Sequence, residues 1–250
     1  MNWSKHRVIL IIFVGIIAGE LFLQSTLDIP SIVPISLGLI YIIILSLGSY
    51  FVSLSYYLPI KNSLESKKSK IIALSFDDGP NMESTDKLLQ ILDKHDVKAS
   101  FFCIGRNIEE NNNLAERIFN EGHIIGNHSY SHSNRFALSG YKKVRDEISR
   151  TNKLIEDITH VKNVYFRPPF GVTNPIIARV VNGLGMTTIG WSLRSYDTIS
   201  SKEKLISKLK LKTKDNDIIL LHDMEQNLVA VDEFINYAKQ QGFKFELIEV

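Results

Sequence analysis

The residues that could do chemistry stand at the ends of apolar segments. Asp77 and Asp78 follow the apolar run 71–76 and precede Gly79 and Pro80. Two adjacent carboxylates beside an apolar strand are costly to bury unless they bind a cation or exchange protons. Because Asp-Asp-Gly-Pro is also good turn sequence, this segment alone leaves a purely structural role open.

Two histidines four positions apart, His128 and His132, follow the strand-like run 123–126. We expect this spacing to place both imidazoles on one face of a helical turn, where they could bind one metal ion. They should lie at the same strand-end face as Asp77 and Asp78. Two histidines and one carboxylate, with open positions for water and substrate, form a known catalytic metal set. His123, at the start of this run, is expected to pack in the strand.

An arginine and a third histidine also stand at strand ends. Arg167 precedes Pro168 and Pro169, whose fixed φ angles make a stiff loop that can hold a guanidinium against a carboxylate. His222 ends the apolar run 218–221, and a histidine there can titrate near neutrality and deliver a proton. The structural alternatives are a solvent-exposed arginine before a turn and a satisfied core histidine.

The elements that must position these residues alternate between strand and helix from residue 70 onward. The expected strands are 71–76, 99–104, 123–126, 164–167, 186–191, 218–221 and 245–248. The expected helices are 83–95, 113–121, 141–158, 175–182, 202–211 and 229–241. This alternation predicts a parallel sheet, and so many units in about 180 residues favour barrel-like closure. In such folds the functional sites lie at the carboxyl ends of the strands.

These motifs, in this order, resemble those of the polysaccharide deacetylase family, also called the NodB homology domain or carbohydrate esterase family 4. The resemblance covers residues 71–250. It implies an α/β fold that is a distorted (β/α) barrel of the NodB type. It also implies that Asp77 is the catalytic base, and that Asp78, His128 and His132 hold a divalent metal ion, usually zinc.

The same resemblance implies roles for residues of the later motifs. Arg167 would orient the base, and the backbone amide of Phe170 would help to hold the oxyanion. Leu220 would line the acetyl pocket, His222 would be the general acid, and Trp191 either walls that pocket or packs in the core. The implied reaction removes an N-acetyl group from an N-acetylhexosamine. The metal polarises the carbonyl and activates water, the base takes the proton of the water, and the acid protonates the departing amine.

One segment departs from the family pattern. Where the family commonly has Asp-x-x-Asp-Trp, this chain has Arg194 at the first acid and Thr198 at the tryptophan, and only Asp197 is retained. In the family the first acid interacts with the motif arginine and tunes the acid histidine, so the departure puts the pKa of His222 and the shape of the sugar subsite in question. The departure motivates a second hypothesis, that the chain is a catalytically silent, membrane-tethered glycan-binding module. A third hypothesis is that the chain is an amidohydrolase with a non-sugar substrate. Retention of Asp77 and His222 speaks against the binding module, because a pure binder needs neither a base nor an acid.

Residues 1–60 are expected to anchor the chain in a membrane. Their only charged residues after position 7 are Glu20 and Asp28. Two apolar segments, about 8–23 and 32–58, predict a transmembrane helical hairpin. This would make the chain a multi-pass protein of the bacterial inner membrane. A cleaved signal peptide is the alternative for the first segment.

The side of the membrane on which the domain lies stays open. Lys5 and Arg7 precede the first apolar segment and several lysines follow the second, which favours a cytoplasmic domain. A single pass would instead place the domain outside. Four aromatic residues near the end of the second segment are expected at the membrane interface: Tyr50, Phe51, Tyr56 and Tyr57. Residues 61–70 read as a polar linker, short enough to keep the catalytic domain near the bilayer.

The overall composition excludes several classes of protein. With 44% hydrophobic and 22% charged residues, the chain is too apolar for intrinsic disorder. Its 29 Lys and Arg against 27 Asp and Glu leave no basic footprint for nucleic acid. The single cysteine, Cys103, is expected to be a buried strand residue, and any metal must use histidine and carboxylate ligands. The expected partners are an N-acetylated glycan, either peptidoglycan or a lipid-linked sugar, and the membrane through residues 8–58.

Overall fold

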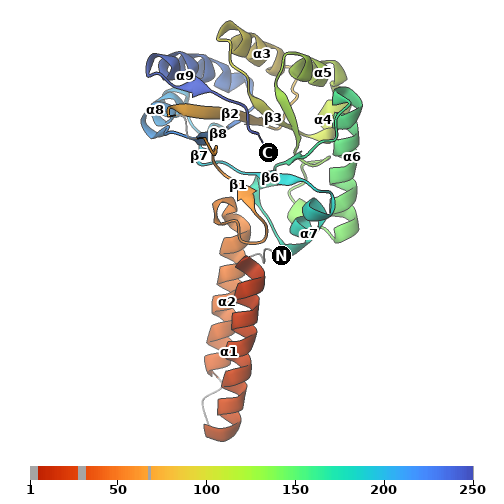
Figure 1. Ribbon diagram of the computed structural model, residues 1–250, viewed down its shortest axis with the longest axis vertical. Helices are drawn as coiled ribbons and strands as arrows, with labels where there is room; N and C mark the ends of the chain where they lie inside the picture. Colours follow the sequence, from red (N-terminus) through yellow and green to blue (C-terminus); the bar gives the residue numbers. More distant parts are fainter. Residues whose placement is uncertain (1–4, 28–31, 67–68, 250) are drawn as a thin grey trace.

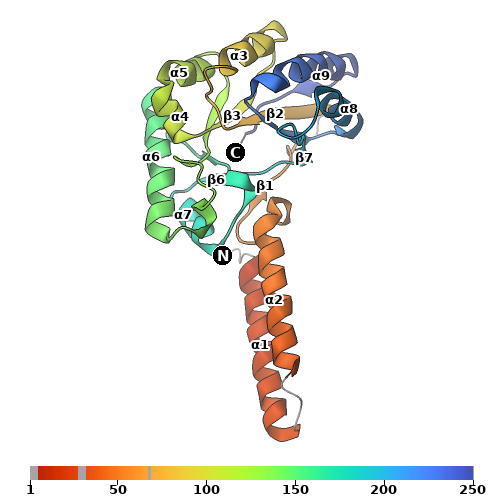
Figure 2. The same ribbon diagram turned by 180° about the vertical axis from the view of Figure 1, so that it is seen from behind.

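The computed structural model describes residues 5–27, 32–66 and 69–249. The molecule consists of a stalk of two helices and a domain in which helices surround a curled sheet (Figure 1). Figure 2 shows the same arrangement from behind, with the stalk projecting from one end of the domain. All residues singled out for chemistry belong to the domain.

The sheet is built from short strands that are mostly buried. They are β1 (Ile60–Lys61), β2 (Ile71–Asp77), β3 (Ser100–Cys103), β4 (Ile124–Asn127), β5 (Tyr165–Phe166), β6 (Thr187–Ile189), β7 (Leu193–Arg194), β8 (Asp217–His222) and β9 (Lys244–Phe245). Their order across the sheet is β1-β6-β5-β4-β3-β2-β8-β7, with β9 also paired to β2. All of these ladders are parallel. The predicted parallel α/β sheet, curled as in the NodB fold, is therefore confirmed.

The central strand β2 is buried along its whole length. Its apolar residues face helices on one side and the inside of the curl on the other, as expected of a parallel sheet. It pairs with β8 from Ile72 opposite Asp217 to Asp77 opposite His222. Because parallel strands bring their carboxyl ends to one edge, Asp77 and His222 lie side by side at that edge.

Helices cover the outside of the sheet. They are α3 (Thr85–Lys94), α4 (Gly105–Glu110), α5 (Asn112–Asn120), α6 (Tyr141–Thr159), α7 (Pro175–Gly183), α8 (Lys202–Lys212) and α9 (Leu228–Gln240). Two of them begin at capping residues: the side chain of Asn174 accepts the N–H of Ile177, and that of Ser201 accepts the N–H of Lys204. All the predicted helices are present with ends shifted by a few residues, whereas the sequence pattern does not predict α4.

The segment between β6 and β7 crosses between the two ends of the sheet. Gly190 donates its N–H to the carbonyl of Lys61 in β1, and Ser192 donates its N–H to the carbonyl of Ile218 in β8. This segment therefore spans the open side of the curl. It carries Trp191 to a position between the two ends.

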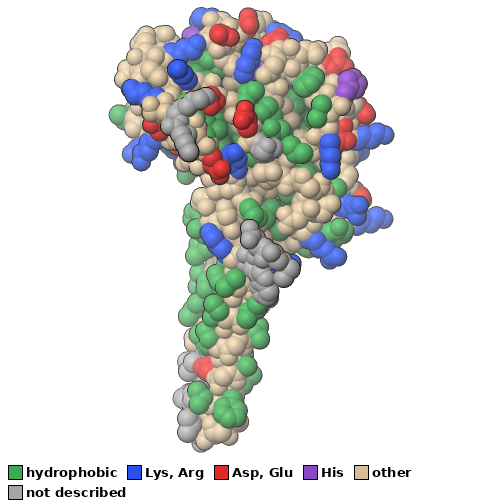
Figure 3. Space-filling view, in the orientation of Figure 1, with side chains coloured by type: hydrophobic (Ala, Val, Ile, Leu, Met, Phe, Trp, Pro, Cys, Tyr) green, Lys and Arg blue, Asp and Glu red, His purple; other side chains and the backbone are tan. Residues whose placement is uncertain are grey.

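The stalk consists of α1 (Lys5–Leu27) and α2 (Ile32–Tyr50), which lie side by side in both views. The rings of Phe13 and Tyr41 stack with centroids 4.2 Å apart. Hydrophobic side chains cover much of its surface (Figure 3). Within the residues that the structure describes, one helix is long and apolar enough to cross a membrane, over Lys5–Thr26 of α1, and the apolar part of α2 is shorter.

The two stalk helices differ in length from the sequence expectation. The first segment, expected at 8–23, belongs to a helix of 23 residues. The second, expected at 32–58, stops being helical at Tyr50 after 19 residues. Part of the expected connection, residues 28–31, lies outside the described residues. Passage of both helices through a membrane stays a prediction.

After α2 the chain passes through a short 3-10 helix, η1 (Val52–Leu54), and enters the domain. Tyr56, Tyr57 and Leu58 are buried in an apolar cluster with side chains of α6 and α7. Contrary to the expectation for interfacial aromatics, the rings of Tyr56 and Tyr57 pack the domain onto the stalk, whereas Tyr50 and Phe51 are exposed. The location of these residues at a membrane interface stays a prediction. Gly48 permits this packing, since a Cβ there would come within 2.4 Å of the Tyr56 ring.

Further contacts attach the stalk and the expected linker to the domain. Strand β1 pairs with β6, and Leu64 is buried with its N–H donated to the carbonyl of Asn216. At the end of α2, the carbonyl of Ser49 accepts the N–H of Thr173 at 3.1 Å. Stalk and domain are therefore joined at several points. The exact domain boundaries stay predictions.

Candidate active site

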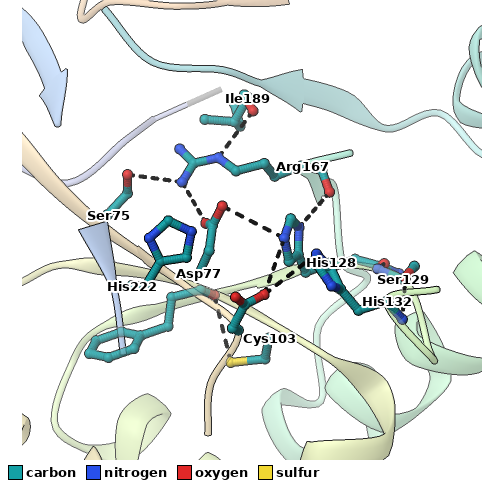
Figure 4. Close-up of polar contacts among 12 residues, drawn as sticks. Ser75, Asp77, Cys103, His128, Ser129, His132, Arg167, Ile189 and His222 are labelled. Carbon is teal, nitrogen blue, oxygen red and sulfur yellow. Dashed lines mark hydrogen bonds and ion pairs between the residues drawn. The ribbon is translucent and has the colours of Figure 1, made fainter. Parts of the chain in front are cut away.

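Residues from four strand ends converge at one edge of the sheet (Figure 4). Asp77 and His222 end β2 and β8 at the same register, His128 follows β4, and Arg167 follows β5. Asp77, His128 and Arg167 are only 4, 2 and 0% exposed. The structure therefore brings together the four motifs that the sequence analysis identified.

Asp78, His128 and His132 form a compact group of potential metal ligands. Their ligand atoms all lie within 4.8 Å of one another. Oδ1 of Asp78 is 3.7 Å from Nε2 of His128 and 3.5 Å from Nε2 of His132. Two imidazole nitrogens and one carboxylate oxygen suit a divalent ion and leave further coordination positions open.

The Asp78 oxygen that faces the histidines is buried, and no donor among the described residues bonds to it. An unpaired buried acceptor is costly. Burial raises the pKa of Asp78, whereas a cation at this oxygen would favour the carboxylate. The group therefore fits a divalent metal ion.

The tautomer of His128 is fixed by the backbone. Its Nδ1 lies 2.8 Å from the carbonyl oxygen of Arg167. Because a carbonyl only accepts, Nδ1 carries the proton and Nε2 presents its lone pair toward Asp78. Burial lowers the pKa of His128, so the ring is neutral near pH 7, the form that binds metal ions.

The two histidines are held by a loop, and the expected helical turn is wrong. Ser129 and His132 have φ angles of 63° and 47°, which lie outside the right-handed helical region. Ser129 donates its N–H to Oδ1 of Asn127, and His132 donates its N–H to Oγ of Ser129. These bonds close a tight loop in which the two imidazole centroids lie 4.8 Å apart.

Glu147 of α6 holds this loop from the other side. Its Oε2 accepts the N–H groups of Tyr130 and Ser131 at 3.1 and 2.8 Å, and its Oε1 accepts the hydroxyl of Ser131 at 2.7 Å. Both contacted residues lie between His128 and His132 in the sequence. Glu147 was not predicted to hold the loop, because a glutamate on an amphipathic helix gives no sequence signal for hydrogen bonds to a distant loop.

Arg167 is fully buried, so the solvent-exposed alternative is wrong. Its Nη1 donates to Oδ1 of Asp77 at 2.7 Å and to Oγ of Ser75 at 3.0 Å. Nε and Nη2 donate to backbone carbonyls at the end of β6 and just after it. The guanidinium carbon lies 3.9 Å from the centroid of the Phe102 ring. These contacts fix the guanidinium in one orientation against Asp77.

Asp77 is held in its ionised form. Burial would raise the pKa of Asp77, but Arg167, His128 and His222 outweigh this effect and hold the pKa below its ordinary value. Its second oxygen, Oδ2, lies 3.6 Å from Nε2 of His128. Asp77 is therefore an ionised acceptor directly beside the metal-ligand group.

His222 is held by Asp197, the acid retained in the departing segment. Asp197 is 1% exposed, and its carboxylate also accepts from Ser195 and Asn227. Burial opposes protonation, but the hydrogen bond to Asp197 and the nearby carboxylates raise the pKa of His222 above its ordinary value. Asp197 therefore contacts the acid histidine, and the hydrogen bonds described for Arg167 do not include Asp197.

His123 and Cys103 have the structural places expected of them. Burial lowers the pKa of His123 to about 4, and its Nδ1 accepts the N–H of Ala99. Cys103 is completely buried in β3, and burial raises the pKa of its thiol. Neither side chain belongs to the metal-ligand group.

Comparison with known proteins identifies the family. The family model for polysaccharide deacetylase matches residues 65–189, half of the chain. The chain belongs to the polysaccharide deacetylase family. Curated members of this family are named as deacetylases of peptidoglycan sugars.

Two curated relatives illustrate the range within the family. A peptidoglycan-N-acetylglucosamine deacetylase of Listeria monocytogenes is 33% identical over 187 residues, which are 74% of this chain and 39% of the relative. A peptidoglycan-N-acetylmuramic acid deacetylase of Bacillus subtilis is 32% identical over 192 residues, which are 74% of this chain and 73% of the relative. The chain thus spans well under half of the first relative and nearly three quarters of the second.

A solved structure of the family agrees with the fold. A pseudoenzyme of carbohydrate esterase family 4 from Bacillus anthracis superposes with a TM-score of 0.68 at 31% identity, covering 73% of this chain and 65% of that chain. The family therefore contains members with this fold that are described as pseudoenzymes. The fold alone therefore does not establish catalytic activity, which depends on the residues of the site.

Three residues assigned by resemblance to the polysaccharide deacetylases surround the site. The Phe170 ring is 54% exposed, with its centroid 4.5 Å from that of His132. Leu220 is buried in β8, two positions before His222. Trp191 lies so close to Gly171 that a Cβ there would come within 2.5 Å of the indole. Their roles toward substrate stay predictions.

The departure from the family pattern involves surface residues close to Trp191 in the sequence. Arg194 and Thr198 are both exposed. The guanidinium carbon of Arg194 lies 5.8 Å from the Trp191 ring. The hydrogen bonds that the structure describes for Arg167 go to Ser75, Asp77, Ile189 and Gly190, which all lie outside residues 194–198.

Proposed function

We propose that this chain is a metal-dependent deacetylase that removes N-acetyl groups from N-acetylhexosamine units of a cell-envelope glycan. The observation that carries the proposal is the unpaired, buried oxygen of Asp78 between two histidines, beside an ionised Asp77. His222 completes the set on the neighbouring strand. A metal-ligand group, a base and an acid at one strand edge are the parts that amide hydrolysis requires.

Asp78, His128 and His132 would hold the metal ion. When bound, a divalent ion supplies Lewis-acid polarisation and makes water more acidic. Zinc is favoured by the donor set of two nitrogens and one oxygen, although several divalent ions accept such ligands. The hydrogen bond from Nδ1 of His128 to the carbonyl of Arg167 orients that ring for ligation.

Asp77 would act as the general base. Its lowered pKa keeps it ionised near neutral pH, and its Oδ1 is already bonded to Arg167. Oδ2 is the oxygen nearer to His128, and it would accept a proton from the attacking water. Arg167 would keep the carboxylate in place while the proton is transferred.

His222 would act as the general acid. Asp197 holds its Nδ1, so Nε2 is the nitrogen available to donate a proton. A raised pKa keeps this ring protonated closer to neutral pH. The departing sugar amine would receive that proton, so that the C–N bond can break without expelling an amide anion.

The remaining residues would bind the acetyl group and the developing charge. The backbone N–H of Phe170 would donate to the oxyanion. Leu220 and Trp191 would enclose the acetyl methyl group against apolar surface. These roles come from the family resemblance, and the position of each residue around the site supports them.

The enzyme would act on its glycan while anchored in a membrane. The apolar helix α1 supports an anchor, and we propose that α2 crosses with it as a hairpin in the bacterial inner membrane. The contact between Thr173 and Ser49 lies only a few residues along the chain from Phe170. This proximity supports a substrate at the bilayer surface, either a lipid-linked sugar or membrane-proximal peptidoglycan.

The proposal is tested with the full chain in detergent, assayed for acetate release from oligomers of N-acetylglucosamine and from peptidoglycan fragments. We expect release that a chelator abolishes and zinc restores, and that the Asp77→Asn variant lacks. The variant must still bind zinc, which separates loss of the base from loss of the metal site. A zinc-loaded, folded chain that binds these glycans without releasing acetate would instead be the silent glycan-binding module.

A further inference from the structure

A pair of positively charged side chains meets at the ring of Tyr196, close in the sequence to Trp191. Arg194 and Lys208 contact the same ring, that of Tyr196, with the guanidinium carbon 5.1 Å and Nζ 3.8 Å from its centroid. Tyr196 is 47% exposed and Arg194 is also exposed. The two cations therefore come from β7 and α8 to one exposed aromatic residue.

These cations lack anionic partners in the part of the chain that the structure describes. The ion pairs found there include neither Arg194 nor Lys208. Burial, followed by the positive charges of Arg194 and Lys212, lowers the pKa of Lys208. The nearby acid Asp197 is buried and committed to His222 and Asn227. Like charges held together without a counter-charge favour binding of an anion.

The charged group is continuous with the catalytic residues. The guanidinium carbons of Arg167 and Arg194 each lie 5.8 Å from the ring of Trp191. The same indole therefore lies near both the arginine that holds Asp77 and the exposed arginine. Trp191 also lies against Gly171. The residue before Gly171 is Phe170, whose ring lies against that of His132.

We propose that Arg194 and Lys208 form a subsite for an anionic group carried by the glycan substrate. This inference rests on the proposed deacetylase function and names the substrate class more narrowly. The guanidinium offers paired donors that match carboxylate or phosphate oxygens, and the ammonium adds a second charge. The anion would be carried by the same glycan as the acetamido group, as a carboxylate on a neighbouring sugar or as a phosphate at the reducing end.

The test uses the full chain in detergent and three glycans of equal length. One is a neutral oligomer of N-acetylglucosamine, one contains a carboxylate-bearing sugar, and one carries a phosphate at its reducing end. We measure kcat and KM for acetate release, and separately the affinity of the Asp77→Asn variant for each glycan. The wild-type chain should prefer at least one anionic glycan, and added salt should weaken that preference. The preferred anion distinguishes the two sources.

Charge removal at the subsite should reduce this preference. Arg194→Gln and Lys208→Gln should each lower the ratio of anionic to neutral kcat/KM by about three- to tenfold, mainly through KM. The control is Lys153→Gln, which removes one exposed charge from α6 on the other side of the domain (Figure 1). It should leave the ratio as in the wild type.

Two results would overturn the inference. One is equal binding of neutral and anionic glycans by the Asp77→Asn variant. The other is a preference for anions that survives both substitutions. Failure of the proposed function would look different, because a zinc-loaded wild-type chain would then release acetate from none of the three glycans while the binding measurements still test the subsite.

Discussion

Asp197 binds His222 twice: Oδ1 lies 2.8 Å from Nδ1 of the ring, and Oδ2 accepts the backbone N–H at 2.7 Å. The first bond sets the tautomer of the ring. The second holds the carboxylate against the backbone at the end of β8, so the two bonds together orient the ring relative to that strand. Because His222 and Asp77 share one register, this also fixes the acid relative to the base. One retained carboxylate therefore holds the acid histidine, whose pKa the departure at Arg194 put in question.

The Asp197→Asn variant should lose activity at high pH first. His222 donates a proton only when protonated, so activity falls as the pH rises through its native pKa, which Asp197 helps to raise. Without that carboxylate the pKa drops, and the falling limb of kcat/KM against pH should move to lower pH. Asp157→Asn, at an exposed position on α6, is the control. An unmoved limb in a folded Asp197→Asn variant would show that Asp197 does not tune the acid.

Replacing Arg167 should affect both stability and activity. Arg167→Met leaves Asp77 buried without its partner, a change that typically destabilises a protein by about 3–5 kcal/mol. The pKa of Asp77 should then rise, because burial is no longer opposed by the guanidinium. The rising limb of the plot of kcat/KM against pH should therefore move to higher pH. Urea unfolding and the pH profile measure the two effects. Arg167→Lys, which keeps the charge but loses the paired donors, should fall between wild type and Arg167→Met in stability.

Glu147 should control metal affinity without binding the metal. Glu147→Gln replaces one acceptor oxygen by a donor and removes bonds to the loop between His128 and His132. Loss of such outer contacts typically costs about 10- to 100-fold in metal affinity. Competition with a chelating dye measures zinc affinity, and circular dichroism checks folding. The adjacent exposed carboxylate gives a matched control, Asp146→Asn, and equal zinc affinity in both variants would contradict the prediction.

Metal removal should abolish activity while the domain stays folded. The apolar core of β2, β3 and β8 with its covering helices is separate from the ligand group. A chelator should therefore stop acetate release with little change in far-ultraviolet circular dichroism, and added zinc should restore release. Activity that persists in protein shown to be metal-free would rule out the metal-dependent reaction.

A fragment beginning at residue 51 should be more stable than one beginning at residue 66. The shorter fragment lacks β1 and the buried side chains Tyr56, Tyr57, Leu58 and Leu64. Full burial of one large apolar side chain stabilises by about 1.5–3 kcal/mol, so the difference should reach several kcal/mol. Urea unfolding of the two fragments measures it. Equal midpoints would mean that these residues pack without stabilising the domain.

The sequence predicted the main strands and helices because each has a clear apolar period and most end at turn residues. It did not predict β1, β7 or α4, which are too short to show a period. The ligand spacing of His128 and His132 was recognisable, but the positive φ angles of the loop between them depend on tertiary contacts with Glu147. Tyr56 and Tyr57 were misplaced because a pair of tyrosines after an apolar segment reads the same whether it meets lipid or a folded domain.

The buried contacts between stalk and domain have a geometric consequence. Tyr56 and Tyr57 pack into the domain, and Thr173 is bonded to the last turn of α2. If the stalk is embedded in a bilayer, these contacts hold the catalytic edge at one height and one tilt above the lipid headgroups. Such an enzyme would choose among acetylated sugars by their distance from the membrane, before any recognition of the sugar itself.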